Sequence, residues 1–400
     1  MYQTPVSLKP LLHPRDFVSA EFWEQEQVAV FAESWHLVAT QRQLRKSGAY
    51  ISVTLLGVPV LVRNFSGEIV ALRNVCAHRQ SLLATEPSGC SPTLKCPYHG
   101  WEYGADGRTR KLPGAANFPK FEHQHYCLDR FAVEVCGDLI FVRLSSTGPS
   151  LREWIGERFE LFAAWFSVEE YHQAMYRRLE FAANWKIPVE NSLESYHIPC
   201  VHPQTFHTDP AEAHSTHEFF ETGTSFQARF HPPRWIDHAL DRAEIWVMHR
   251  LGCVPDGMYQ HHHVFPNLLI SHTDSTSFVQ MIHPVGPDRS FSLMWQYGRG
   301  GERLPFVPRV ISRLWGQFTG ALTRTIVLED VPVYALVQSG AAGAGKPGLL
   351  GRCEERIHAS QKYLRDRIDV WQAERHASRS KPDGAAASVS ASLKTNQDND

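Results

Sequence analysis

The sequence predicts an α+β fold, with a small antiparallel β region followed by a larger domain of mixed composition. Apolar residues alternate with a period of two within 36–146 and again within 220–300, which indicates strands. Apolar residues recur at helical spacing within 16–35, 151–165 and 310–322. Strands and helices that occupy separate runs of the chain are typical of α+β proteins.

Length and composition exclude several classes of protein. The 400 residues are enough for two domains with a substantial core, and the formal net charge of −2 announces no basic surface for nucleic acid or anionic membrane. No apolar run approaches the roughly eighteen residues of a membrane helix, and the N-terminus lacks the pattern of a signal peptide. The eight cysteines show no disulfide framework, so we expect reduced thiols and a cytoplasmic location.

Two Cys–His pairs form the strongest motif in the chain. Cys76 and His78 are separated by one residue, and Cys96 and His99 by two. Two cysteines and two histidines are also a possible tetrahedral zinc set, but zinc fingers usually pair Cys with Cys and His with His. The alternating order instead resembles the Rieske [2Fe–2S] site, in which two cysteines hold one iron and two histidines hold the other.

Neighbouring residues extend this resemblance. Pro97, Gly100 and Trp101 match the second Rieske loop, and Arg79 matches the first. Gln80 departs from the glycine often found at its position, which concerns the shape of the loop and not the ligands. Loops that connect the strands of a small β domain can hold such ligands rigidly. They can also leave one imidazole edge exposed, and that edge would be the path for electrons.

A second histidine pair lies in the stretch NWKIPVENSLESYHIPCVHP. Asn191, Glu194 and His197 are three residues apart and would share one face of a helix, which Pro199 is expected to end at the preceding residue. His202 would then curl back from the turn beside His197. Two histidines and one carboxylate form the usual non-haem iron site with open positions, although a histidine pair at a helix end is also common as a purely structural feature.

Together these motifs resemble the Rieske non-haem iron oxygenases, the catalytic α-subunit family of ring-hydroxylating dioxygenases and related monooxygenases, over about residues 16–370. Asn184-Trp185-Lys186 and Glu190-Asn191 match the family's approach to the iron histidines. The resemblance implies a Rieske domain and a helix-grip (START-like) catalytic domain, whose curved antiparallel sheet encloses a pocket. The expected divisions are an N-terminal helical segment at 1–35, the Rieske domain at 36–146, the catalytic iron domain at 147–375 and a disordered tail at 376–400.

The third iron ligand follows from the resemblance, because the family places an aspartate in a C-terminal helix. Asp330 is the best match, with Glu329 as the competitor. Tyr334 and Gln338 would share a helix face with Asp330. Pro332 is a departure, since a proline here is expected to kink the helix or to start a new one.

Glu194 lies where a carboxylate can hydrogen-bond the imidazole of His197 from outside the metal site. In the family, the equivalent acid bridges to a cluster histidine of the neighbouring subunit, so the resemblance would place His99 of one chain opposite Glu194 of another. A solvent-exposed glutamate is the alternative. Asn191 would support the site.

The resemblance implies a [2Fe–2S] cluster, a mononuclear Fe(II), a homotrimer and a separate NAD(P)H-dependent reductase, with or without a ferredoxin. The reaction would hydroxylate or oxidatively demethylate a small organic substrate with O2. Glutamate in ESYHIPCVHP is similar to the branch acting on quaternary ammonium compounds such as carnitine, glycine betaine and choline. An aromatic or natural-product substrate, a Rieske electron carrier and a zinc-stabilised binding protein are the alternatives.

Two further features carry weaker hypotheses. Trp235, Trp246 and Trp295 could build a box for a cation, although core packing is the commoner role of tryptophan. The run His261-His262-His263 is an improbable metal site, because consecutive residues of a strand point to opposite faces.

Overall fold

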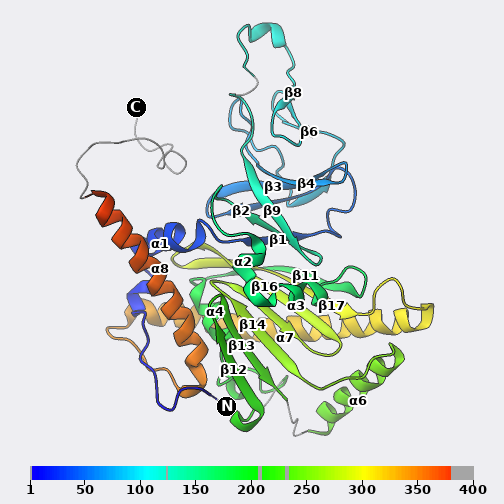
Figure 1. Ribbon diagram of the computed structural model, residues 1–400, viewed down its shortest axis with the longest axis vertical. Helices are drawn as coiled ribbons and strands as arrows, with labels where there is room; N and C mark the ends of the chain where they lie inside the picture. Colours follow the sequence, from blue (N-terminus) through cyan, green and yellow to red (C-terminus); the bar gives the residue numbers. More distant parts are fainter. Residues whose placement is uncertain (1, 123–124, 206–209, 230–233, 380–400) are drawn as a thin grey trace.

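The computed structural model describes residues 2–122, 125–205, 210–229 and 234–379, and it confirms the α+β prediction. Figure 1 shows a narrow upper lobe of strands above a wider body that contains the long helices. Every strand pair within the sheets is antiparallel.

The upper lobe contains a seven-stranded sheet in the order β1-β10-β9-β4-β3-β2-β5 and a three-stranded sheet β6-β7-β8. Its strands are β1 (His36–Thr40), β2 (Ala49–Leu55), β3 (Val58–Phe65), β4 (Glu68–Arg73), β5 (Ser88–Cys90), β6 (Leu94–Lys95), β7 (Glu102–Tyr103), β8 (Thr109–Lys111), β9 (Arg130–Cys136) and β10 (Leu139–Arg143). The longer strands are those that the alternation of apolar residues predicts, because one face of each packs on the core.

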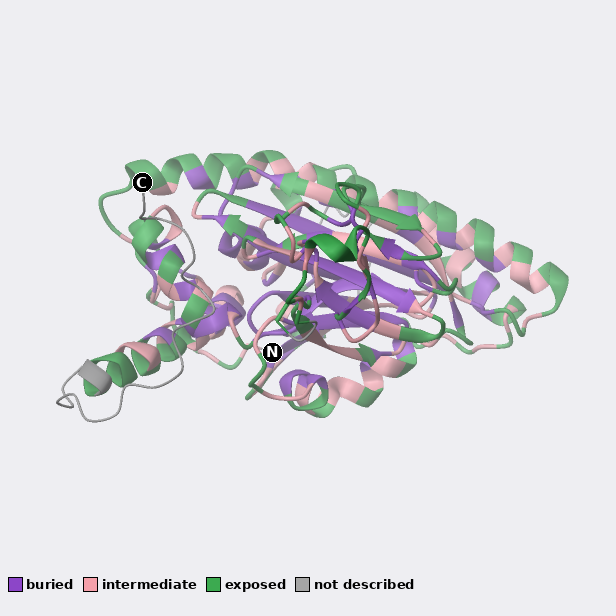
Figure 2. Cartoon of the chain, turned by 90° about the horizontal axis from the view of Figure 1, so that it is seen from above, coloured by how far each residue is buried: buried purple, intermediate pink, exposed green. Residues whose placement is uncertain are grey.

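The wider body is built on a curved seven-stranded sheet in the order β11-β17-β16-β15-β14-β13-β12. Its strands are β11 (Tyr171–Phe181), β12 (Ser215–Phe220), β13 (Gly223–Ala228), β14 (Tyr259–Val264), β15 (Leu268–His272), β16 (Thr276–Gly286) and β17 (Arg289–Arg299). Figure 2 shows these strands as a buried layer bordered by largely exposed helices.

The helices depart from the predictions in three places. They are η1 (Pro14–Phe17), α1 (Ala20–Glu26), η2 (Gln27–Phe31), η3 (Ala115–Asn117), α2 (Leu151–Ile155), η4 (Gly156–Arg158), α3 (Phe159–Trp165), α4 (Lys186–Ser192), α5 (Ile198–Val201), η5 (Glu212–His214), α6 (Trp235–Arg250), α7 (Phe306–Gly343), η6 (Arg352–Glu354) and α8 (Glu355–Arg379). The segments 16–35 and 151–165 are each broken; in the second, Gly156 has a φ of 77° that interrupts the helix. Helix α6 lies within 220–300, where only strands were expected.

One continuous core joins the two parts of the molecule. Leu37 of β1 and Phe141 of β10 belong to the same buried cluster as Val279 and Trp295 of the large sheet. The backbone N–H of Leu37 also donates to the sulfur of Met281 at 2.9 Å. Each such fully buried apolar side chain stabilises the fold by about 1.5–3 kcal/mol, so this shared core fixes the upper lobe on the body.

Helix α7 runs unbroken through Pro332, contrary to the expectation of a kink or a new start. Pro332 lies on the exposed face of the helix, so the carbonyl of Leu328 that loses its hydrogen bond can be hydrated. On the inner face, a Cβ at Gly316 would lie only 2.8 Å from the His172 ring nitrogen of β11. Glycine therefore permits the close approach of α7 to the large sheet.

Helix α7 is also tied to the segment that precedes α4. The side chain of Gln338 in α7 accepts a hydrogen bond from the N–H of Asn184 at 2.7 Å, just before α4.

The predicted tail at 376–400 begins inside α8, and its residues from 380 on lie outside the described part of the chain. None of the described helices combines the length and the apolar character that crossing a membrane requires.

Buried histidines make the fold sensitive to acid. His36 of β1 is 1% exposed and stacks on His283 of β16, with ring centroids 5.9 Å apart. Burial lowers the pKa of His36 to about 4. An unfolded chain would bind a proton at this residue below pH ~6.5 whereas the folded chain would not, so its contribution to stability is complete above that pH and is lost as the pH falls.

We expect His36→Phe to reduce the acid sensitivity of the protein. Between pH 7.5 and pH 5.0, the titration of His36 should cost the wild type about 2 kcal/mol of unfolding free energy, which the variant retains. Urea unfolding at the two pH values measures this difference. His249→Phe, which replaces an exposed histidine of α6, is the control and should keep the wild-type pH dependence; an equal dependence in His36→Phe would contradict the prediction.

Candidate metal centres

The predicted cluster residues meet at the loops that surround the three-stranded sheet. Cys76 and Cys96 are each 2% exposed, and their side chains lie within hydrogen-bond distance of each other. The rings of His78 and His99 contact edge to face with centroids 4.6 Å apart, and His99 is exposed. The two thiols are therefore buried, whereas the imidazole of His99 reaches the surface. Electron entry through a histidine edge requires this arrangement.

The two loops share one backbone design. In each, the N–H of the cysteine donates to the carbonyl five residues later at 2.8 Å, and the cysteine carbonyl accepts from the N–H four residues later at 3.0 Å. That fourth residue has a positive φ in both loops, 54° at Gln80 and 76° at Gly100. Gln80 thus occupies a left-handed conformation that glycine adopts more easily.

Side chains around the cysteines also fit a cluster. The Tyr103 hydroxyl accepts from the N–H of Ala77 and contacts the Cys76 sulfur, both at 3.1 Å, so its own hydrogen is free to point at the sulfur. His78 stacks on Trp101 with centroids 4.7 Å apart. The buried Nδ1 of His78 has no hydrogen-bond partner among the described residues, which leaves it available as a ligand.

The second predicted set also converges. His197, His202 and Asp330 each offer one ligand atom, and these atoms lie within 4.8 Å of one another. The Oδ1 atom of Asp330 is 3.1 Å from Nε2 of His202 and 3.6 Å from Nε2 of His197. His197 and Asp330 are 133 residues apart in the sequence, so only the folding of α5 against α7 brings the three side chains into one site.

A glutamate holds the far nitrogen of each imidazole. Oε1 of Glu194 is 2.5 Å from Nδ1 of His197, and its other oxygen accepts from the His197 backbone N–H at 3.1 Å. Oε2 of Glu329 is 2.7 Å from Nδ1 of His202 and also accepts from the Thr205 hydroxyl at 2.8 Å. Since carboxylates accept hydrogen bonds, both Nδ1 atoms carry the proton and both Nε2 lone pairs face Asp330.

This arrangement fits a metal cation. A neutral imidazole with its hydrogen on Nδ1 has only an acceptor at Nε2, so Asp330 Oδ1 faces two further acceptors. That oxygen is buried and has no hydrogen-bond partner within the described ranges. Burial lowers the pKa of His202, but the carboxylates of Asp330 and Glu329 outweigh it and raise this pKa overall. A cation bound between the three atoms would remove the repulsion.

The local structure around the histidines differs from the predicted single helix. Helix α4 ends at Ser192, Glu194 lies in the following turn, and Pro199 stands in the first turn of the short helix α5. Proline is accepted there because the first N–H groups of a helix have no internal partner. The turn brings Glu194 back to His197, so the two side chains meet without sharing a helix.

The structure assigns different positions to the two acids of α7. Asp330 points at the Nε2 atoms, whereas Glu329 contacts the opposite side of His202. Tyr334, one turn after Asp330, is buried and hydrogen-bonds the side chain of Asn191. Sequence reasoning missed the contact of Glu329 with His202, because adjacent acids on a helix give no sign of which one faces inward.

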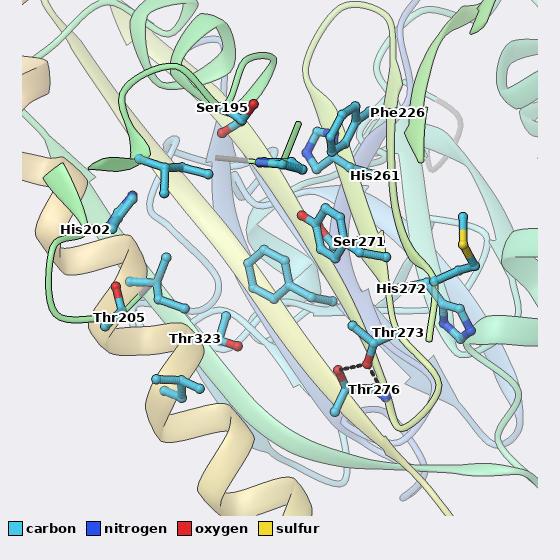
Figure 3. Close-up of a pocket in the computed structure, with 18 of the residues that line it drawn as sticks. Ser195, His202, Thr205, Phe226, His261, Ser271, His272, Thr273, Thr276 and Thr323 are labelled. Carbon is cyan, nitrogen blue, oxygen red and sulfur yellow. Dashed lines mark hydrogen bonds between the residues drawn. The ribbon is translucent and has the colours of Figure 1, made fainter. Parts of the chain in front are cut away.

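A cavity of about 850 Å³ extends from the metal-binding residues along the inside of the large sheet. In Figure 3, His202 and Thr205 lie beside the long helix, while Phe226 and His261 lie on the strands at the other side. Sequence reasoning did not single out Phe226, Trp315 or Arg356 of its wall, because strand and helix residues far apart in the chain form it.

The tryptophan box is wrong. Trp295 is fully buried against Tyr176, Trp235 and Trp246 are 79% and 49% exposed, and none of the three lines the cavity. The histidine run follows the alternation expected of a strand: His261 faces the cavity, whereas His262 packs against Phe162 and Trp165 of α3 outside it.

The fold and the two sets of ligands define a protein that joins a Rieske lobe to a domain with a two-histidine, one-carboxylate site. Sequence profiles agree: the Rieske [2Fe-2S] domain matches residues 34–122, and the ring hydroxylating alpha subunit (catalytic domain) matches residues 168–370. The chain belongs to the ring hydroxylating alpha subunit family, as the resemblance in its motifs predicted.

Curated relatives include the oxygenase subunit of glycine betaine monooxygenase from Pseudomonas aeruginosa, 28% identical over 48% of this chain and 44% of the relative. Choline monooxygenase of Spinacia oleracea is 25% identical over 71% and 66% of the two chains. The chain thus spans about half to two thirds of the length of these relatives.

The fold is similar to a solved quaternary ammonium Rieske monooxygenase, described in connection with carnitine oxidation by gut microbiota and inter-subunit electron transfer. The TM-score is 0.69 at 20% identity, over 92% of this chain and 95% of the other.

Gln80→Gly should stabilise the protein. The left-handed conformation costs a non-glycine residue about 1–2 kcal/mol, and glycine avoids this cost. Glycine loses more backbone entropy on folding, so we expect a net increase in the free energy of unfolding of about 0.5–1 kcal/mol. Thermal unfolding of the cluster-loaded protein measures the gain. Gly100→Ala, at the matching position of the other loop, should lower stability. A loss of stability in Gln80→Gly would show that the glutamine side chain supports the loop.

Asp330→Ala and Glu329→Gln should distinguish a metal ligand, Asp330, from a residue that only orients a ligand, Glu329. Without the carboxylate of Asp330, the mononuclear iron should be lost while cluster iron and sulfide remain. Glu329→Gln should still take up that iron, with an affinity lower by about 10–100-fold, because only the orientation of His202 is weakened. Iron and sulfide analysis after titration with Fe(II) measures both effects, and the reverse order of severity would make Glu329 the ligand.

Proposed function

We propose that the chain is the oxygenase component of a Rieske-type system, which uses O2 and electrons from a separate reductase to hydroxylate or oxidatively demethylate a small organic substrate. The observation that carries this proposal is the convergence of His197, His202 and Asp330 at the wall of a cavity large enough for an organic molecule. Ligand cavities of several hundred Å³ are typical of small-molecule sites.

The proposed cofactors are a [2Fe–2S] cluster on Cys76, Cys96, His78 and His99, and a mononuclear Fe(II) on the two histidines and Asp330. When bound, the cluster would relay single electrons and the mononuclear iron would activate O2. The donor sets support this assignment, since thiolates with imidazoles suit the cluster and two imidazoles with one carboxylate leave open positions on iron.

The chain's own residues prepare the site in three ways. Glu194 and Glu329 keep the protons on the Nδ1 atoms, so that both imidazoles present lone pairs to one point. The side chains of Asn191 and Tyr334 hydrogen-bond each other and line the cavity together with Asp330. Strands β13 to β16 line the opposite side of the cavity.

A quaternary ammonium substrate is favoured over an aromatic or natural-product one. The relatives named above act on glycine betaine and choline, which supports the same class here. Carboxylates also outnumber guanidinium groups among the described residues that line the cavity: Asp237, Asp241, Glu244, Asp256 and Asp274, against Arg229 and Arg356. An excess of acidic groups attracts cations.

We further propose a homotrimer served by an NAD(P)H-dependent reductase, with or without a ferredoxin. In Figure 1, β6 and β8 lie near one end of the longest axis, far from α4 and α7 in the body. Transfer of electrons from His99 of one subunit to the Glu194 region of the next would avoid this distance. The inter-subunit electron transfer described for the solved relative supports the same arrangement.

The test is a single turnover of the chemically reduced, iron-loaded protein. Mixing with O2 and glycine betaine, carnitine or choline should re-oxidise the cluster and yield oxygenated or demethylated product, at least for one compound. Absorption of the cluster and mass spectrometry of the products measure the reaction. Re-oxidation that is independent of substrate and yields no product would indicate an electron carrier instead.

Glu194→Ala should slow this substrate-dependent re-oxidation by about 10–100-fold, because His197 loses the carboxylate that orients it. Glu221→Ala, in an exposed position before β13, is the matched control and should react at the wild-type rate. An unchanged rate in Glu194→Ala would remove both its support of His197 and its proposed bridge between subunits.

A further inference from the structure

An arginine is buried in the wall of the cavity. Arg356 stands at the start of α8, is 2% exposed and lines the same cavity as Asp330. Its Nε donates to the hydroxyl of Thr224 on β13 at 3.1 Å, and its Nη2 donates to Nδ1 of His261 on β14 at 2.9 Å. Two strands therefore fix the plane of the guanidinium.

Both partners of Arg356 are neutral, and no carboxylate of the described residues forms an ion pair with it. The acid next to it in sequence, Glu355, is turned away and binds Nδ1 of His217 at 2.8 Å. Burial lowers the pKa of Arg356 to about 9, so the side chain still carries its charge at neutral pH. A buried cation without a counter-ion is costly, which points to a negative charge supplied by a ligand.

The guanidinium has donors left for that charge. A guanidinium has five N–H groups, and the two hydrogen bonds to Thr224 and His261 leave Nη1 without a partner among the described residues. Burial and the charge of Arg356 lower the pKa of His261 well below its usual value, so this ring is neutral. Because its Nδ1 accepts from Arg356, its one hydrogen is on Nε2, which provides a further donor at the cavity wall.

We propose that Arg356, with His261 beside it, binds a carboxylate group of the substrate. A planar guanidinium pairs with a planar carboxylate through parallel hydrogen bonds, which an alcohol cannot reproduce. This proposal rests on the proposed function and narrows it: among quaternary ammonium compounds, the substrates are the carboxylate-bearing betaines and not the amino alcohols. The carboxylate is held on the strand side of the cavity, and the remainder of the molecule extends toward His202 and Asp330.

Paired ligands that differ only in the carboxylate test the proposal. Glycine betaine is compared with choline, and carnitine with its methyl ester, by calorimetric titration of the iron-loaded protein without O2. In the wild type, each acid should bind at least about 10-fold more tightly than its neutral counterpart, as expected for charge-assisted hydrogen bonds. Equal binding within both pairs, or no binding of either acid, would overturn the proposal.

Variants locate the effect. Arg356→Gln should weaken binding of the acids by about 10–100-fold and leave choline and the ester unchanged within about 2-fold. Arg356→Lys should retain part of the preference, which keeps the test decisive if the uncharged variant does not fold. Arg324→Gln removes an exposed arginine of α7 that does not line the cavity, and this control should preserve the wild-type ratio. A preference for acids that survives in Arg356→Gln would assign the carboxylate to another residue.

The binding and turnover experiments test the two proposals independently. If the acids bind in the predicted order but no reduced protein yields product, the carboxylate site stands and the oxygenase proposal falls. If choline and the ester bind and react as well as the acids, the oxygenase proposal stands and the role of Arg356 falls.

Discussion

The structure depends on three acceptor atoms that face one another at the head of the cavity. Oδ1 of Asp330 approaches Nε2 of His202 to 3.1 Å, and the imidazole proton is committed to Glu329 on the other side. Such a contact is repulsive in the absence of a cation, so the surrounding elements must force it. The metal would then contribute to folding as well as to chemistry, because it replaces a repulsion with three bonds.

Helix α7 supplies this force. It carries Glu329 and Asp330 as neighbours, about 100° apart around the helix axis, so that the two acids reach opposite nitrogens of one imidazole. The close packing of Gly316 on β11 and the bond from Gln338 to Asn184 fix the helix on both sides of the site. Continuity through Pro332 matters for the same reason, since a kink would rotate Asp330 relative to Gln338.

Sequence reasoning succeeded where chemistry is local and failed where it depends on distant contacts. The pairs Cys76–His78 and Cys96–His99 are separated by so few residues that a loop must bring each pair together, and alternation alone located most strands. The predicted end of the helix at Ile198 was wrong, because a proline such as Pro199 can either follow the end of a helix or stand in the first turn of a new one. The contacts of Glu329 with His202 and of Arg356 with His261 carried no signal, since the partners are 127 and 95 residues apart in the sequence.

His261 of β14 shows how the cavity wall can be polar without being charged. Burial and the charge of Arg356 lower the pKa of His261 well below its usual value, and burial lowers the pKa of its neighbours His262 and His263 to about 3. Protonated neighbours would repel Arg356, whereas neutral imidazoles accept and donate hydrogen bonds without adding charge. Arg356 is buried in this wall, whereas Arg229, the other guanidinium among the described residues that line the cavity, is exposed at its rim, so an anionic group that enters the buried part meets Arg356. Orientation of a substrate follows from that asymmetry, because Arg356 and His261 would hold its anionic end on the strand side of the cavity, across from His202.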